Sequence, residues 1–122
     1  MAESKQYITK IQDNGSIMIS EDVIASIVSQ GVQEVEGVVG LSVKPGADIA
    51  DIIVKKNWGK GMRIVIAEDN SLTVDCDILI SYGQSVVAVA QNVQETVSSH
   101  LESMTGVTVN AVNVNVCGIS RQ

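Results

Sequence analysis

Apolar and polar residues alternate along the middle of the chain in the pattern of paired strands. We predict strands over residues 62–67 and 72–82, joined by the polar connection 68–71. In the second strand, every other residue from Leu72 to Tyr82 is apolar, so these side chains point to one face of the sheet. The opposite face carries the polar residues Thr73, Asp75, Asp77 and Ser81, interrupted by Leu79.

Two other segments carry apolar residues at helical spacing. Ser20 and the two acids after it are typical of a helix start, because a hydroxyl caps the first turn and acids face the positive end of the helix dipole. We predict that this helix runs to about Glu34, with Gly31 allowing close packing against the sheet, and that a longer helix covers residues 85–104 and ends at a left-handed Gly106. The predicted apolar stripes are Val23, Ile24, Ile27, Val28 and Val35 in the first helix, and Val86, Val89, Ala90, Val93, Val97, Leu101 and Met104 in the second.

Three further segments complete the first half of the chain. Residues 16–19 are predicted to form a short strand, and residues 37–43 a buried strand that ends in a turn at Pro45 and Gly46. Residues 47–54 fit either a short helix or a strand, with helix favoured slightly.

The closing strand switches its apolar side partway along. Val107, Val109 and Ala111 occupy the odd-numbered positions, which point to one face of the strand. Val112, Val114 and Val116 occupy the even-numbered positions, which would point to the other face. Because a slip of one residue would turn the second half of the strand to the wrong face, the pattern predicts a β-bulge near Ala111 and Val112.

These elements define an α+β fold in the order β-α-β-(α)-β-β-α-β. We predict a two-layer sandwich, in which a small mixed sheet packs against two main helices. The closing strand–helix–strand unit should cross over right-handed if its strands are parallel neighbours. Residues 1–15 are predicted to be an N-terminal arm or edge strand, residues 16–118 a single domain, and residues 119–122 a short tail.

Composition narrows the class of function. The 122 residues carry a formal charge of −6, which disfavours nucleic-acid binding, because phosphate recognition needs a basic surface. Aromatic residues make up 2% of the chain, so a pocket that stacks flat ligands is not expected. The chain shows no signal segment and no run of about 18 apolar residues, so we expect a cytoplasmic protein without direct membrane insertion.

Six short segments, in this order and spacing, resemble the alkaline shock protein family of Gram-positive bacteria. They are residues 19–25, 34–40, 82–83, 90–95, 104–106 and 111–118. The resemblance covers the chain from about Gly15 to Gly118, although Asn115 stands where the family often carries a histidine. It implies a stress-response protein without known catalysis, linked to alkaline and cell-envelope stress. It also implies self-association and, in some members, attachment to the membrane through a separate membrane-anchored protein.

The most unusual stretch is a basic loop around the single tryptophan. The candidate residues for docking a protein partner are Lys55, Lys56, Trp58, Lys60 and Arg63. Tryptophan and arginine are frequent at interface hot spots, and the cations would steer an acidic partner. The alternatives are a solvated loop whose tryptophan folds back onto the domain, or a site for an anion or small acidic ligand on the Gly59-Lys60-Gly61 backbone.

Two other motifs are better explained by structure. The GxxG pattern at residues 37–40 matches a nucleic-acid-binding loop of the KH type, but its two valines are wrong for clamping a phosphate backbone. Asp75 and Asp77 share a strand face but lack the further ligands that calcium or a transition metal requires. We therefore expect a solvated strand face there and no metal.

No set of residues predicts catalysis or cofactor binding. His100 is expected to be solvated on the outer face of its helix, Cys76 to lie in the core, and Cys117 to be exposed, without a disulfide between the two cysteines. The favoured hypothesis is an interaction module that forms homo-oligomers through exposed strand edges or a helix face. It binds protein partners, one of which is membrane-anchored in some members of the family that the chain resembles.

Overall fold

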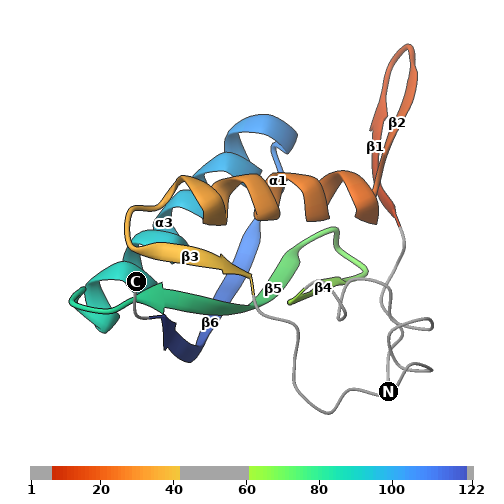
Figure 1. Cartoon of the computed structure of the whole chain (residues 1–122). Helices are drawn as coiled ribbons and strands as arrows, with labels where there is room; N and C mark the ends of the chain where they lie inside the picture. Colours follow the sequence, from red (N-terminus) through yellow and green to blue (C-terminus); the bar gives the residue numbers. More distant parts are fainter. Residues whose placement is uncertain (1–6, 42–60, 121–122) are drawn as a thin grey trace.

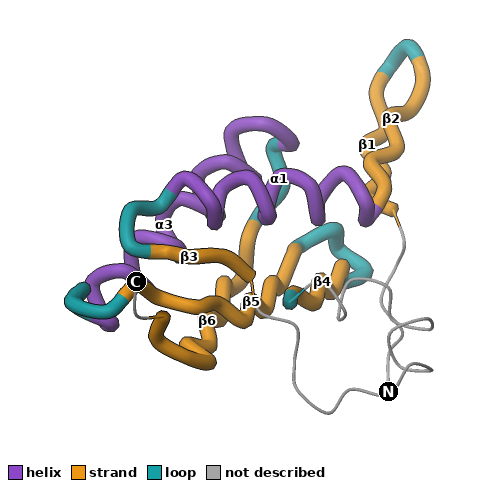
Figure 2. The backbone as a smooth tube through the Cα atoms, in the orientation of Figure 1, coloured by secondary structure: helices purple, strands orange, loops and turns teal. Residues whose placement is uncertain are grey.

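The computed structural model describes residues 7–41 and 61–120. Helices α1 (Glu21–Glu34) and α3 (Val86–Thr105) pack together on one face of a four-stranded sheet (Figure 1). Figure 2 shows both helices on the same side of these strands. The predicted two-layer α+β fold is confirmed. The predictions for Pro45 and Gly46 and for residues 47–54 lie outside the described residues.

Strand β5 (Leu72–Ser81) is the centre of the sheet. On one edge it pairs antiparallel with β4 (Met62–Ile66) along its first half and with β3 (Val38–Leu41) along its second half. Strand β6 (Val109–Ser120) runs parallel to β5 along the other edge. The sheet is therefore mixed, as the sequence predicts, and the strands on either side of α3 are parallel neighbours, which meets the condition set for a right-handed crossover.

A two-stranded hairpin projects beyond the start of α1 (Figure 1). It consists of β1 (Tyr7–Gln12) and β2 (Gly15–Ser20), so the predicted arm or edge strand is a strand that pairs with the next segment. The base of the hairpin is attached to the domain by the fully buried Ile8 and by the Asn70 amide, which donates to the Thr9 carbonyl at 3.1 Å.

The caps predicted at Ser20 and Gly106 are confirmed, and Ser85, predicted as the first residue of the second helix, is its N-cap. The Ser20 hydroxyl accepts a hydrogen bond from the Val23 backbone N–H, and the Ser85 hydroxyl accepts one from the Ala88 N–H, each at 3.4 Å. Gly106 ends α3 in the left-handed conformation with φ of 71°. These caps fix where each helix begins and ends. The apolar stripe of each helix then lies over the sheet.

The core lies between the helices and one face of β5. Its fully buried side chains include Ile24, Val28 and Val32 from α1, Val93, Val97 and Leu101 from α3, and Leu72, Val74, Cys76, Ile78 and Ile80 from β5. The strict alternation of buried and half-buried residues along β5 matches the predicted pattern.

Several predicted core positions are wrong. Val23, Val86 and Met104 are exposed because they lie in the first or last turns of their helices, and Met104 keeps 68% of its surface. Tyr82 is exposed just past the end of β5. Gly31 allows close packing against α3 rather than against the sheet, since a Cβ there would lie 3.6 Å from a Val97 methyl group.

Strand β3 is a partly exposed edge strand, not the predicted buried one. Of the described strands it pairs with β5 alone, and Val39 is exposed. A strand with one neighbour has hydrogen-bonding partners along one edge and is exposed along the other. The apolar run at residues 37–43 does not show whether the strand has one neighbour or two. Residues 42 and 43 lie outside the described residues.

The bulge predicted near Ala111 and Val112 lies just before them. The register shifts at Asn110, so that Val109 pairs with Leu72 and Ala111 with Thr73. The Asn110 amide donates to the Ser71 hydroxyl at 2.8 Å, and that hydroxyl donates to Asp69 at 2.6 Å, which fixes the bulge. A second shift follows at Cys117.

Candidate interaction surfaces

The predicted docking residues are only partly described. Lys55, Lys56, Trp58 and Lys60 lie outside the described residues. Arg63 lies on β4, where its guanidinium contacts Asp75 through one nitrogen at 2.9 Å and donates through Nε at 3.2 Å. Its charge is thus already paired with a carboxylate on the open face of the sheet.

The open face of the sheet carries a ladder of polar side chains across β4, β5 and β6. Asn113 donates its amide to Asp75 at 2.8 Å, and Asn115 donates to Asp77 at 3.0 Å. The two carboxylates therefore bond to neighbouring strands. Within residues 7–41 and 61–120, no three His, Cys, Asp or Glu side chains converge in a way that could hold a metal ion.

We call the outer edge of β6 open because none of the strands within residues 7–41 and 61–120 lies on it. Strand β6 pairs with β5, and no other described strand lies beside it. From Val109 to Ser120 the strand contains no charged residue and no proline. The Gln94 amide of α3 donates to the Val112 carbonyl at 3.0 Å on this edge. Natural edge strands usually carry charges or prolines that discourage pairing with another chain, so this edge is unusually permissive.

The projecting hairpin exposes apolar side chains. In its register, Tyr7, Ile11 and Met18 share one face, and Ile11 keeps 86% of its surface. Ile17 is also exposed on the opposite face. Apolar groups held away from the body in this way are typical of a contact surface.

Further exposed apolar residues lie near the end of the sheet where β5 stops. The Tyr82 N–H donates to the Ser120 carbonyl and the Ser81 N–H to the Gly37 carbonyl, so three segments meet there. Their exposed apolar side chains are Val39, Tyr82 and Ile119, and Val87 follows in the first turn of α3.

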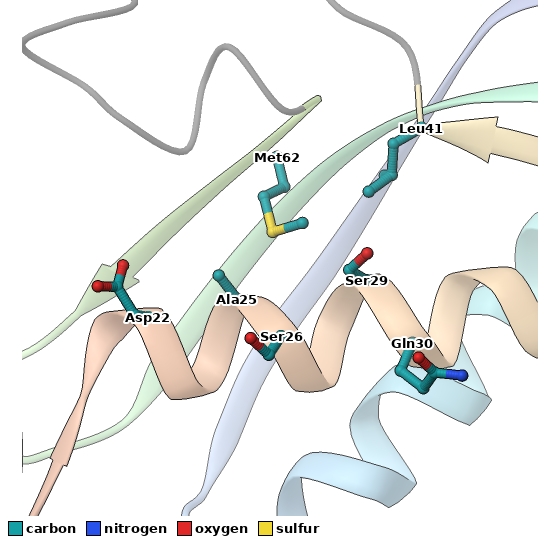
Figure 3. A pocket seen from close by; sticks show the side chains of 7 residues that line it. All are labelled: Asp22, Ala25, Ser26, Ser29, Gln30, Leu41 and Met62. Carbon is teal, nitrogen blue, oxygen red and sulfur yellow. The ribbon is translucent and has the colours of Figure 1, made fainter.

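A shallow hollow of about 610 Å³ lies beside α1 (Figure 3). It is lined by Asp22, Ala25, Ser26, Ser29, Gln30, Leu41 and Met62. Among the described residues that line it, Asp22 is the single ionisable side chain, and none is a histidine or a cysteine. Leu41 and Met62, which line the hollow, lie next to the undescribed residues 42–60. The described lining does not indicate a reaction or a class of ligand.

His100 is not on the solvated outer face that the sequence predicts. It lies at the contact between the helices, with Nε2 3.5 Å from a Glu34 carboxylate oxygen and Nδ1 close to Gly31. His100 follows Val93 by seven residues, which is close to two full helical turns, so both side chains lie on nearly the same side of α3. The prediction of an outward-facing His100 was therefore wrong.

Neither cysteine forms a disulfide, and the two differ in environment. Burial, and then the nearby charges of Asp75 and Asp77, raise the pKa of the Cys76 thiol to about 12. Cys117 is exposed at the second bulge of β6. Cys76 therefore behaves as a core side chain, as expected, and Cys117 is the accessible thiol.

The β6 edge and the ladder of asparagines are the features that sequence reasoning missed. The signal was present, because asparagines alternate with valines at residues 112–116. Which edge of the strand stays open depends on strand order, which that pattern does not specify.

The described part of the chain defines a two-layer α+β domain that presents an open strand edge and exposed apolar groups. A family model, that of the alkaline shock protein 23 family with a cell envelope-related function, matches residues 9–121. The chain belongs to this family, as its motifs indicate.

Similar proteins occur in Streptococcus pyogenes and Bacillus subtilis. The uncharacterized protein Spy1614 of Streptococcus pyogenes serotype M6 is 37% identical over 108 residues, which cover 87% of this chain and 88% of that protein. The uncharacterized protein YqhY of Bacillus subtilis is 30% identical over 105 residues, covering 86% of this chain and 77% of that protein.

Among solved structures, forms of the MamM CTD resemble the fold. Two of them align with TM-scores of 0.48 and 0.49 at 12% identity, over 83% of this chain and 94% and 96% of theirs. In the ranges that the structure describes, neither helix has the length and apolar character needed to cross a membrane.

Proposed function

We propose that this chain is a non-catalytic protein-interaction and scaffolding module that serves the cell envelope, including its response to alkaline stress. The observation that carries the proposal is the open, uncharged edge of β6. An added strand satisfies the unpaired backbone groups of such an edge through main-chain hydrogen bonds, so the edge favours association with another protein chain.

The projecting hairpin supports the same function. The hairpin projects from the body of the domain (Figure 1), and its Ile11 and Met18 are exposed, so they contribute little to the stability of the single domain. Contact with a partner would remove them from water. We propose that the chain acts in the cytoplasm and reaches the membrane through a membrane-anchored partner, since its charge of −6 disfavours direct adsorption to anionic lipid.

Sedimentation velocity over a wide range of protein concentration tests self-association. The proposal predicts a weight-average sedimentation coefficient that rises with concentration. A single sharp monomer at the highest concentration would remove self-association from the function.

The basic loop is proposed as a second contact, for an acidic protein partner. Capture from native lysate of the parent bacterium should lose partners when Trp58→Ala and Lys60→Ala are combined. The control is Met104→Ala, which trims an exposed apolar side chain outside the basic loop. An identical set of captured proteins in all three samples would exclude the loop from partner binding.

A further inference from the structure

The open edge of β6 is self-complementary in sequence. Residues 112–116 read Val, Asn, Val, Asn, Val, which is the same in both directions about Val114. The two register shifts, at Asn110 and Cys117, lie outside this stretch, so the strand is regular between them. We propose that two copies of this chain pair β6 with β6, antiparallel, about a two-fold axis at Val114. This inference rests on the proposed function, because it names the second copy as the partner.

The side chains match in this arrangement. Each Val112 lies opposite Val116 of the second copy, and each Asn113 lies opposite Asn115 of the second copy. Valine thereby continues the core side of the sheet, and asparagine continues its polar open face. A shift of one residue would place asparagine opposite valine and lose this match.

The backbone has the right polarity for the same pairing. Alternate residues of a strand direct their N–H and C=O groups to opposite edges. The Val112 carbonyl accepts from Gln94 and so points away from β5, and by alternation Val114 and Val116 also direct their backbone groups outward. Val114 then forms the hydrogen-bonded pair at the axis, and the Gln94 amide covers one of the acceptors until a second strand arrives.

The asparagines fall in the closer, non-hydrogen-bonded pairs. There, facing Cα atoms lie about 4.5 Å apart and side chains meet readily. Each asparagine amide donates to an aspartate of its own copy, Asp75 or Asp77, and also has a second N–H and a carbonyl oxygen. These groups can bond across the interface, so the ladder of each copy can extend into the other.

The flank of α3 above this edge also permits approach. His100 marks the side of α3 that faces α1, and Gln94 marks the opposite side, which faces the edge of β6. By helical period, Val87, Gln91 and Ser98 share that side with Gln94. None of these four residues is charged, and Glu95 and Glu102, which adjoin them, lie further round the helix toward solvent. The four positions themselves therefore add no like-charge repulsion between two α3 helices.

A register-specific disulfide tests the pairing. In a Cys117→Ser background, one sample carries Asn113→Cys and another carries Asn115→Cys. In the proposed register these positions face each other between copies, within the Cα separation that a disulfide requires, whereas 113 and 113 lie on a diagonal of about 7–8 Å. Mild oxidation should cross-link the mixed sample and leave each separate sample uncross-linked, as judged by non-reducing electrophoresis.

A repulsive variant gives an independent test. Asn113→Lys combined with Asn115→Lys places lysine opposite lysine across the axis, and each lysine lies beside an aspartate of its own copy. We expect the dimer dissociation constant to rise about tenfold or more in sedimentation experiments. Thr73→Lys, on the same face but on the central strand, should leave it unchanged. Val114→Pro removes an outward N–H without disturbing the β5 pairing and should act like the double lysine variant.

The outcomes separate this inference from the proposed function. If the wild type self-associates but the double lysine and proline variants associate equally well, β6 is not the interface. Cross-linking in the separate samples to the same extent as in the mixture, or in none of them, would equally overturn the register. A wild type that stays monomeric would instead defeat self-association itself.

Discussion

Single residues decide how the GxxG segment at residues 37–40 is used. Gly37 has φ of 97°, and a Cβ added there would lie 2.9 Å from a Val89 methyl group. Gly40 has neither constraint, with no atom of the described residues within 4 Å of its Cβ position. Backbone conformation and packing therefore require glycine at position 37 but not at position 40. This difference is typical of a glycine that serves a turn, not of a GxxG loop that binds nucleic acid.

We expect Gly37→Ala to lower the free energy of unfolding by about 1–3 kcal/mol, the usual cost of a left-handed non-glycine residue. Gly40→Ala, the matched control, should change it by less than about 0.5 kcal/mol. Urea denaturation followed by circular dichroism measures both. Equal losses in the two variants would contradict the assignment.

The buried thiol makes stability depend on alkaline pH. Because the pKa of Cys76 is raised from about 9 to about 12 in the folded chain, the unfolded chain loses this proton first as pH rises. The contribution of Cys76 to folding is thus complete below about pH 9 and is lost progressively toward pH 12.

At pH 10 the loss should be about 1 kcal/mol relative to pH 8. Cys76→Ala, although less stable at every pH because it leaves a cavity, should show a smaller decline between pH 8 and pH 10. Denaturant titrations at the two pH values give the comparison. Parallel declines in wild type and variant would show that Cys76 is not responsible.

At the scale of elements, the hairpin combines a firm base with an exposed tip. Ile8 is fully buried, whereas Ile11, three residues along the same strand, is largely exposed. Ile8→Ala should cost about 2–5 kcal/mol of stability and Ile11→Ala less than about 0.5 kcal/mol. Chemical denaturation tests this, and a large cost for Ile11→Ala would mean that the tip packs against the domain.

The elements themselves could largely be predicted from sequence, because each rests on a local pattern. Alternation along β5, the caps at Ser20 and Ser85, and the left-handed Gly106 all act within a few residues. The exposure of Val23 and Met104, the position of His100 and the edge position of β3 depend on where the sheet ends and which strand lies beside which. Those are tertiary relations that periodicity alone does not encode.

The candidate surfaces were less predictable than the fold. Arg63 was recognised among the basic residues, but its pairing with Asp75 requires β4 and β5 to be adjacent in the observed register. The open edge of β6 likewise follows from strand order. The surfaces through which we propose that this chain acts thus exist only once the whole sheet has assembled.

At the scale of the whole molecule, the account requires that other protein chains cover the open edge of the sheet. Hydrogen–deuterium exchange at two protein concentrations measures this most directly. Backbone amides of Val114 and Val116 should exchange quickly in a dilute sample and become protected in a concentrated one, while amides of α1 stay unchanged. Exchange at these amides that is the same at every concentration would contradict the account.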